Sequence, residues 1–145
     1  MVALRKPEIF SGLEVIPLDK TEKKLEEVEE VELRKLAKRL QDYMEREQIF
    51  LNPDLNLKEL ASQLSVPPRE LSRAINRIHE QSFFDYINRH RIELAKEKIQ
   101  HPKDPKVTVL EIMYEVGFQS KSSFNTAFKK FTGLTPTQWK RQAKR

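Results

Sequence analysis

One internal repeat limits the fold of this chain more than any other sequence feature. Apolar residues occur twice at the spacing i, i+3, i+4, i+7, which places them on one face of an α-helix. The two sets stand 52 residues apart: Leu57, Leu60, Ala61 and Leu64, then Val109, Ile112, Met113 and Val116. Further along, the pair Phe124 and Phe128 follows the pair Leu71 and Ile75 at an offset of 53. The repeat predicts two copies of a unit built from two short helices.

Composition supports an all-α fold. The 145 residues include 3 glycines, and Leu, Lys, Glu, Arg and Gln, which favour helix, are abundant. Runs of alternating polar and apolar residues with the length of a strand are scarce. The absence of cysteine excludes disulfides and thiolate metal sites. There is neither a signal-peptide leader nor an apolar run of the roughly 18 residues that span a membrane.

No arrangement of side chains suggests catalysis, a cofactor or a metal site. Hydroxyl, acidic and histidine residues occur singly, without a catalytic triad, a phosphate loop or an acid pair. The three histidines, His79, His90 and His101, fall on different predicted elements without an acidic cluster nearby. We therefore predict a protein that is not an enzyme.

The pattern divides the chain into three parts. Residues 1–21 contain prolines and lack periodicity, which predicts an extended arm or linker. The pattern of residues 22–50 predicts a helical extension with an apolar stripe formed by Leu33, Leu36, Leu40 and Tyr43 or Met44. This stripe is expected to pack against the rest of the domain; the alternative is a dimer seam. Residues 51–142 form the repeated domain. Its units lie at about 56–80 and 108–132, and a long helix at about 82–100 joins them.

Charge is distributed unevenly along the chain. Residues 1–50 carry a net charge of −2, whereas residues 51–145 hold 17 basic and 10 acidic residues, a net of +7. Glu115 is the last acid. The basic residues after it are Lys121, Lys129, Lys130, Lys140, Arg141, Lys144 and Arg145. Such a block indicates an anionic partner such as nucleic acid; the alternative is a basic tail that maintains solubility.

Each repeated unit meets the requirements of a helix-turn-helix. The turn needs a small residue or one that tolerates positive φ, and Gly117 and Ser65 stand at the two turns. The second helix needs an apolar face and an opposite face that reaches base edges. The predicted base contacts are Arg69, Ser72, Arg73, Asn76, Lys121, Ser122, Asn125 and Thr126. The predicted DNA backbone contacts are Arg77, Ser120, Ser123, Lys129, Lys130 and Lys140.

Two further groups receive structural interpretations. The spacing of Phe124, Phe128 and Phe131 places them on one helix face, which favours core packing over stacking on bases. Arg91 is predicted to be solvated or in an ion pair with Glu93 or Glu97 on the long helix.

The motif GFQSKSSFNTAFKKFTGLTPTQW, residues 117–139, resembles the C-terminal signature of AraC/XylS-type transcription regulators. The shared features are a Gly-Phe turn, a serine-rich helix start, Phe-Lys-Lys, a glycine and Thr-Pro before an aromatic residue. Met113 and Pro68 depart from the family pattern. The resemblance covers about 51–142. It implies a bacterial seven-helix domain that binds sequence-specific duplex DNA and regulates transcription, with recognition helices roughly 34 Å apart in successive major grooves.

The resemblance also suggests a cellular context. The segment LRKPEIFSGLEV is similar to juxtamembrane segments of longer members that carry a membrane-embedded sensor. We therefore expect this chain to be the cytoplasmic part of a larger, membrane-anchored protein. The segment itself is expected not to contact the membrane. Its expected partners are double-stranded DNA, with RNA polymerase or a second copy of the chain. The alternative is a protein-interaction module that uses the helix at 22–48 as a coiled-coil or docking arm.

Overall fold

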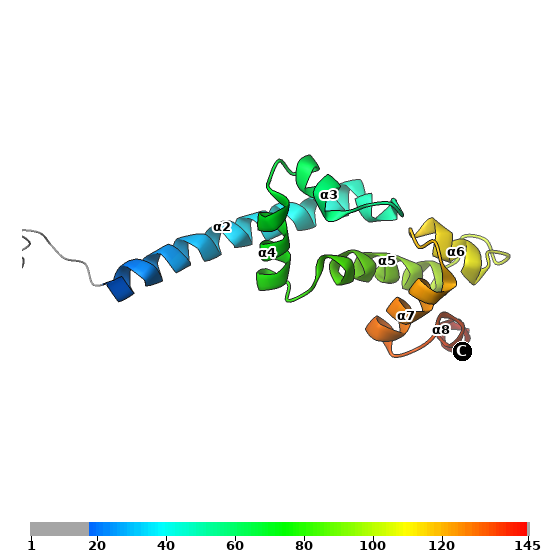
Figure 1. Cartoon of the computed structure of the whole chain (residues 1–145). Helices are drawn as coiled ribbons and strands as arrows, with labels where there is room; N and C mark the ends of the chain where they lie inside the picture. Colours follow the sequence, from blue (N-terminus) through cyan, green and yellow to red (C-terminus); the bar gives the residue numbers. More distant parts are fainter. Residues whose placement is uncertain (1–17, 145) are drawn as a thin grey trace, which may run out of the picture. The chain divides into compact units, whose positions relative to one another are not determined.

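The computed structural model describes residues 18–144, and every regular element in that range is helical (Figure 1). The elements are α2 (Leu18–Glu47), the 3-10 turn η2 (Ile49–Leu51), α3 (Leu57–Gln63), α4 (Pro68–Ile78), α5 (Phe83–Gln100), α6 (Val109–Glu115), α7 (Lys121–Thr132) and α8 (Pro136–Ala143). The predicted all-α class is confirmed. The part of the predicted arm at residues 1–17 lies outside the described residues, and residues 18–21 begin α2.

The chain divides inside α2, into residues 1–32 and a compact unit, Leu33–Arg145. The part of α2 in the compact unit buries the predicted leucine stripe. Leu33 and Leu36 pack with Ala74 of α4, while Leu40 and Met44 join the core beneath α3 and α4. The predicted packing of this stripe is confirmed. The dimer-seam alternative for these side chains is wrong, because the domain itself covers them.

Both helix-turn-helix turns have the same hydrogen bonds. After α3, the amide of Val66 donates to the carbonyl of Ala61 at 3.0 Å; after α6, Phe118 donates to Met113 at 3.1 Å. This bond ends a helix in a Schellman motif, which requires a left-handed residue next to it. Ser65 and Gly117 occupy that position with φ of 57° and 106°. The sequence repeat is therefore also a repeat of backbone geometry.

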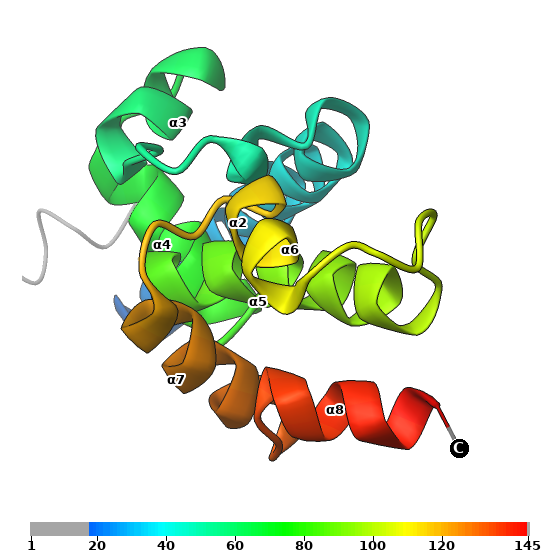
Figure 2. The ribbon, with the colours of Figure 1, turned by 90° about the vertical axis from the view of Figure 1, so that its right-hand side faces the viewer.

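Helix α5 takes part in two separate cores. Its first half contributes Phe83, Tyr86 and Ile87 to the core of the first helix-turn-helix, α3–α4. Its second half contributes Ile92, Ala95 and Ile99 to the core of the second helix-turn-helix, α6–α7. Figures 1 and 2 show α5 between these parts, with α7 and α8 below it in both views. One helix therefore positions both units.

Local sequence explains where these helices begin. The side chains of Asn56, Ser82, Thr108 and Ser120 each accept a hydrogen bond from a backbone amide in the first turn of the helix that follows. Helix α4 has no such cap and begins with Pro68 instead. Proline suits this position because its ring fixes a helical φ, and the amide it lacks would have no partner within the helix.

Candidate nucleic-acid interface

Helix α4 presents a polar face opposite its buried face. Leu71, Ala74 and Ile75 are fully buried. The predicted contacts on the other side are exposed or half-buried: Arg69, Ser72, Arg73, Asn76 and Arg77. Three arginines, an asparagine and a serine on one short surface provide donors suited to guanine, adenine and phosphate.

Helix α7 divides in the same way. Phe124 and Phe128 are buried with Ala127, and Phe131 is partly buried against the same core, which confirms the core interpretation of the phenylalanines. The predicted contacts from this helix and its cap are all exposed: Ser120, Lys121, Ser122, Ser123, Asn125, Thr126, Lys129 and Lys130.

The N-terminus of α7 has a chemistry suited to an anion. Helices α3, α5 and α6 carry Glu59, Asp85 and Glu111 in their first turns, where an acid stabilises the positive end of the helix dipole. The first turn of α7 has no acid and instead begins with Lys121. The hydroxyl of Ser120 accepts from the amide of Ser123 at 3.2 Å. A phosphate at this end would complement both the amides and the lysine.

The predicted backbone contacts do not all lie together. The Nζ of Lys130 lies 2.7 Å from a carboxylate oxygen of Asp85 on α5, so it is held beside the linker helix. Lys140 lies on α8 and lines a separate pocket of about 330 Å³ with residues of the α5–α6 connection. Lys140 is therefore on neither of the two polar helix faces.

The structure brings further residues beside α7 that the sequence patterns did not single out. Asn88 of α5 lines two shallow grooves, one with Ser120 and Ser123, the other with Ser122 and Thr126. Phe84 is strongly exposed and lines the first of these grooves. The sequence holds one signal for them: Phe84 and Asn88 directly follow the apolar residues Phe83 and Ile87, so they lie beside the buried face of α5 and not within it. Which partner they face depends on the tertiary fold.

The environment of Arg91 differs from the prediction that this residue is solvated or in an ion pair. Its guanidinium is buried and donates to two backbone carbonyls, of Phe50 at 2.7 Å and Asn52 at 2.9 Å. Glu93, its predicted partner, pairs with Lys96 at 3.1 Å instead. The prediction was wrong because η2, which is distant in sequence, supplies neutral acceptors where an acid was expected.

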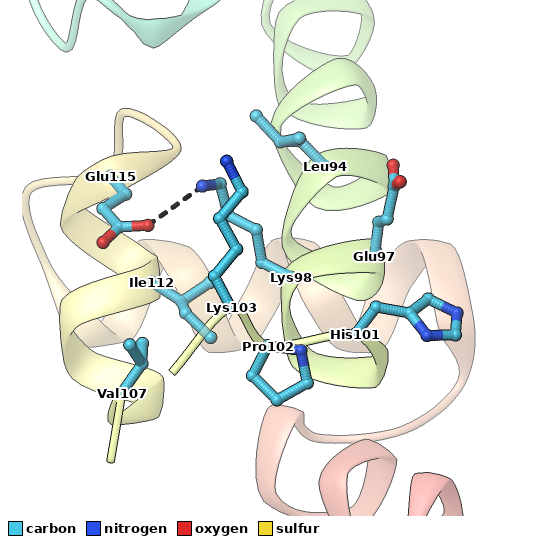
Figure 3. A pocket seen from close by; sticks show the side chains of 9 residues that line it. All are labelled: Leu94, Glu97, Lys98, His101, Pro102, Lys103, Val107, Ile112 and Glu115. Atoms are coloured by element: carbon cyan, nitrogen blue, oxygen red, sulfur yellow. Dashed lines mark ion pairs between the residues drawn. The ribbon is translucent and has the colours of Figure 1, made fainter. Parts of the chain in front are cut away.

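A larger pocket, of about 550 Å³, lies at the C-terminal end of α5 and contains none of the predicted contacts. Figure 3 shows Lys98 reaching from α5 toward Glu115 on α6, an ion pair of 3.1 Å. The pocket is also lined by exposed side chains of both charge signs, including Glu97 and Lys103. This mixture does not define a site for one charge type.

Within residues 18–144, no three acidic, histidine or cysteine side chains come together as metal ligands. None of the helices in this range is long and apolar enough to cross a membrane.

Comparisons with known proteins agree with this geometry. A family model described as a helix-turn-helix domain matches residues 60–142. The chain is similar to the transcriptional regulatory protein YesN of Bacillus subtilis, with 36% identity over 93 residues, 63% of this chain and 25% of that protein. It thus spans a quarter of that relative's length.

Two solved structures share the fold. The C-terminal domain of AraT, a response regulator from Geobacillus stearothermophilus, matches with a TM-score of 0.64 and 32% identity, covering 74% of this chain and 84% of that one. The C-terminal domain of the two-component response regulator YesN from Fusobacterium nucleatum matches with a TM-score of 0.60 and 26% identity. This match covers 71% of this chain and 95% of that one.

Proposed function

This chain belongs to the AraC-type helix-turn-helix family of DNA-binding transcription regulators, and from that premise we propose that α4 and α7 enter successive major grooves of one duplex. The family is not a family of enzymes. The observation that carries the proposal is the repeated turn. The same hydrogen bonds set α4 against α3 and α7 against α6, so both second helices direct a polar face outward.

The side chains on these faces suit different parts of DNA. Arg69, Arg73 and Asn76 of α4 have the donors and acceptors that distinguish guanine and adenine in the major groove. On α7, the proposed contacts to base edges are Lys121, Ser122, Asn125 and Thr126. The proposed phosphate contacts are Arg77, Ser120, Ser123, Lys129 and Lys130, together with Lys140, which lies outside these faces on α8. Phosphate contacts fix the register of the protein and contribute affinity without sequence information.

Selection of bound sites from a random duplex library tests the proposal. We expect recovered sites to share two sequence blocks whose centres are about one DNA turn, roughly 10 base pairs, apart. A single block would mean that one helix alone reads bases. No enrichment over the starting library would contradict the proposed function.

Two asparagine variants assign the blocks to the helices. Asn76→Ala on α4 should relax the preference within one block, and Asn125→Ala on α7 should relax it within the other, because each removes one amide able to pair with adenine. Loss of the same block in both variants would contradict the assignment. Each variant serves as the matched control for the other.

A second candidate function is protein interaction through α2, and a specific observation favours it. Leu25, Val28 and Val31 are 64%, 56% and 49% exposed at a spacing of three residues. We propose a second copy of the chain as the partner of this stripe. Sedimentation of the chain and of Val28→Glu tests it: a dimer that Val28→Glu dissociates supports pairing, and a wild-type monomer at high concentration contradicts it.

Two proposals concern the whole regulator. RNA polymerase is the further partner that we propose, and transcription in vitro from a template carrying the selected site tests it. We also propose that this chain is the cytoplasmic part of a longer, membrane-anchored regulator. Its support is the similarity of the N-terminal segment to juxtamembrane sequences, and fractionation of cells that express the full protein tests it.

A further inference from the structure

Among the described residues, Arg91 is the charged side chain that the fold buries, at 8% exposure. It lies on α5 where the first core gives way to the second. Burial lowers the pKa of its guanidinium, since the charged form has lost water. The oxygens that accept its hydrogen bonds belong to the carbonyls of Phe50 and Asn52 and to the Asn88 side-chain amide. All three are neutral, so the buried charge is not compensated by a hydrogen-bonded carboxylate. A costly group in this place calls for an explanation.

The contacts of Arg91 join three segments that are distant in sequence. Its Nε donates to the carbonyl of Phe50 at 2.7 Å, and its Nη2 to that of Asn52 at 2.9 Å. Its guanidinium carbon lies 5.6 Å from the ring centroid of Phe118, directly after the second turn. We use the name Arg91 junction for Phe50, Asn52, Arg91, Gly117 and Phe118.

Gly117 permits this close approach. A Cβ at this position would lie 2.6 Å from the carbonyl oxygen of Phe50 and 2.9 Å from the Nε of Arg91. Real Cβ atoms do not come this close to other heavy atoms, so a side chain would force the turn away from η2. Ser65 fills the equivalent position of the first turn and is exposed. The repeat therefore has a glycine at the turn that contacts the other half of the domain.

Two other polar contacts between the halves lie at the surface. Lys130 pairs with Asp85, and the amide of Gln119 donates to the carboxylate of Asp54 at 3.3 Å. Exposed pairs of this kind contribute little to a fixed geometry because water competes for them. The planar guanidinium, with its donors in a fixed fork, restricts direction as well as distance.

We propose that the Arg91 junction is a positioning device that fixes α7 relative to α4, and thereby sets the spacing between the two DNA blocks that the chain accepts. The statement about spacing rests on the proposed function; the statement about the two helices does not. Arg91 acts through the turn at Gly117 and does not itself contact DNA.

The first experiment measures the geometry without DNA. The chain has no cysteine, so nitroxide labels attach only at Glu70→Cys on α4 and Lys129→Cys on α7, both exposed positions. Pulsed electron resonance then gives the distribution of distances between them. We expect a narrow distribution in the parent chain and a broadened or shifted one in Arg91→Met and Arg91→Lys. An unchanged distribution in folded variants overturns the proposal.

A pair of glycine variants controls for backbone strain. Gly117 and Gly133 both have positive φ, but a Cβ on Gly133 would meet nothing within 4 Å. Gly117→Ala should alter the distance distribution, while Gly133→Ala should retain it, since only the first adds a clash at the junction. Equal behaviour of the two variants overturns the proposal. Global unfolding of every junction variant does so too, because it would indicate a folding requirement.

The second experiment varies the spacing of the two blocks in the selected duplex by one, two and five base pairs. The parent chain should bind the selected spacing best, and Arg91→Met should reduce that preference roughly tenfold, as expected when hydrogen bonds of a charged group are lost. A parent chain without any spacing preference contradicts the two-groove function but leaves the distance experiment standing. An unchanged preference in Arg91→Met overturns the inference alone.

Discussion

His90 shows how one side chain couples the fold to pH. Its ring stacks on Phe50, with centroids 5.5 Å apart, and meets the edge of Tyr86 at 4.9 Å. Burial lowers the pKa of His90 below 6.5, and its neighbours His79 and Arg89 act in the same direction. Glu45 and Glu93 oppose this shift without cancelling it. Burial of the His90 ring therefore favours its neutral form over its charged form.

We predict that this histidine makes the domain less stable as the pH falls. Below about pH 6.5 the unfolded chain takes up a proton that the folded chain resists, so the free energy of unfolding decreases as the pH falls further. His90→Phe retains an aromatic ring but cannot titrate. Urea unfolding at several pH values should therefore show a flatter pH dependence for His90→Phe than for the parent chain. Parallel curves would refute the prediction.

Arg73 provides a prediction about base recognition. On the selected duplex, Arg73→Ala should cost roughly 1–3 kcal/mol of binding free energy and relax the preference at one base pair. Arg77→Ala, on the same helix face, is the matched control and should weaken all duplexes about equally. Fluorescence anisotropy with singly substituted duplexes distinguishes the two. A uniform loss in Arg73→Ala would make Arg73 a backbone contact.

Single residues differ in how far the sequence predicts them. The burial of Phe124 and Phe128 follows from their spacing, because a helix face is a local property. The environment of Arg91 does not follow, since its acceptors belong to η2, some forty positions earlier. The ion pair of Lys130 with Asp85 could not be predicted either, because Asp85 is also distant from Lys130 in the sequence. Local patterns show which side chains face inward, but not which distant backbone they meet.

At the scale of elements, helix ends are the most predictable feature. A serine directly before a helix is a favoured N-cap, and Ser120 accepts from the amide of Ser123 while donating to the Ser123 hydroxyl at 2.9 Å. The turns at Ser65 and Gly117 were also expected, because small or left-handed residues suit them. The division of the chain inside α2 was not visible in the periodicity, since one helical pattern continues across it.

The cap gives a prediction about α7. Ser120→Ala should lower the free energy of unfolding by about 1 kcal/mol, because a first-turn amide of the helix loses its acceptor. Ser122→Ala is the control: this exposed serine follows the cap and is not the N-cap acceptor. Thermal unfolding without DNA separates the structural effect from any effect on binding. Equal melting temperatures for the two variants would refute the role of the cap.

At the scale of the whole molecule, charge and shape act together. The seven basic residues after Glu115 are uncompensated in sequence, and α7 presents several of them beside the small polar side chains. Such a surface attracts the DNA backbone before any base is contacted. Affinity is then expected to come largely from this end of the chain, and sequence preference from the two polar faces. The two contributions should respond differently to salt.

We therefore predict a steep loss of affinity between about 50 and 200 mM salt, on the order of a hundredfold, as neutralisation of about four phosphates requires. Lys129→Gln removes one proposed phosphate contact and should lower the slope of log affinity against log salt by about 1. Lys103→Gln, an exposed lysine in the α5–α6 connection, should leave the slope unchanged. Anisotropy titrations at several salt concentrations measure all three chains. A flat affinity would exclude phosphate neutralisation as its source, and equal slopes for the two variants would remove Lys129 from the interface.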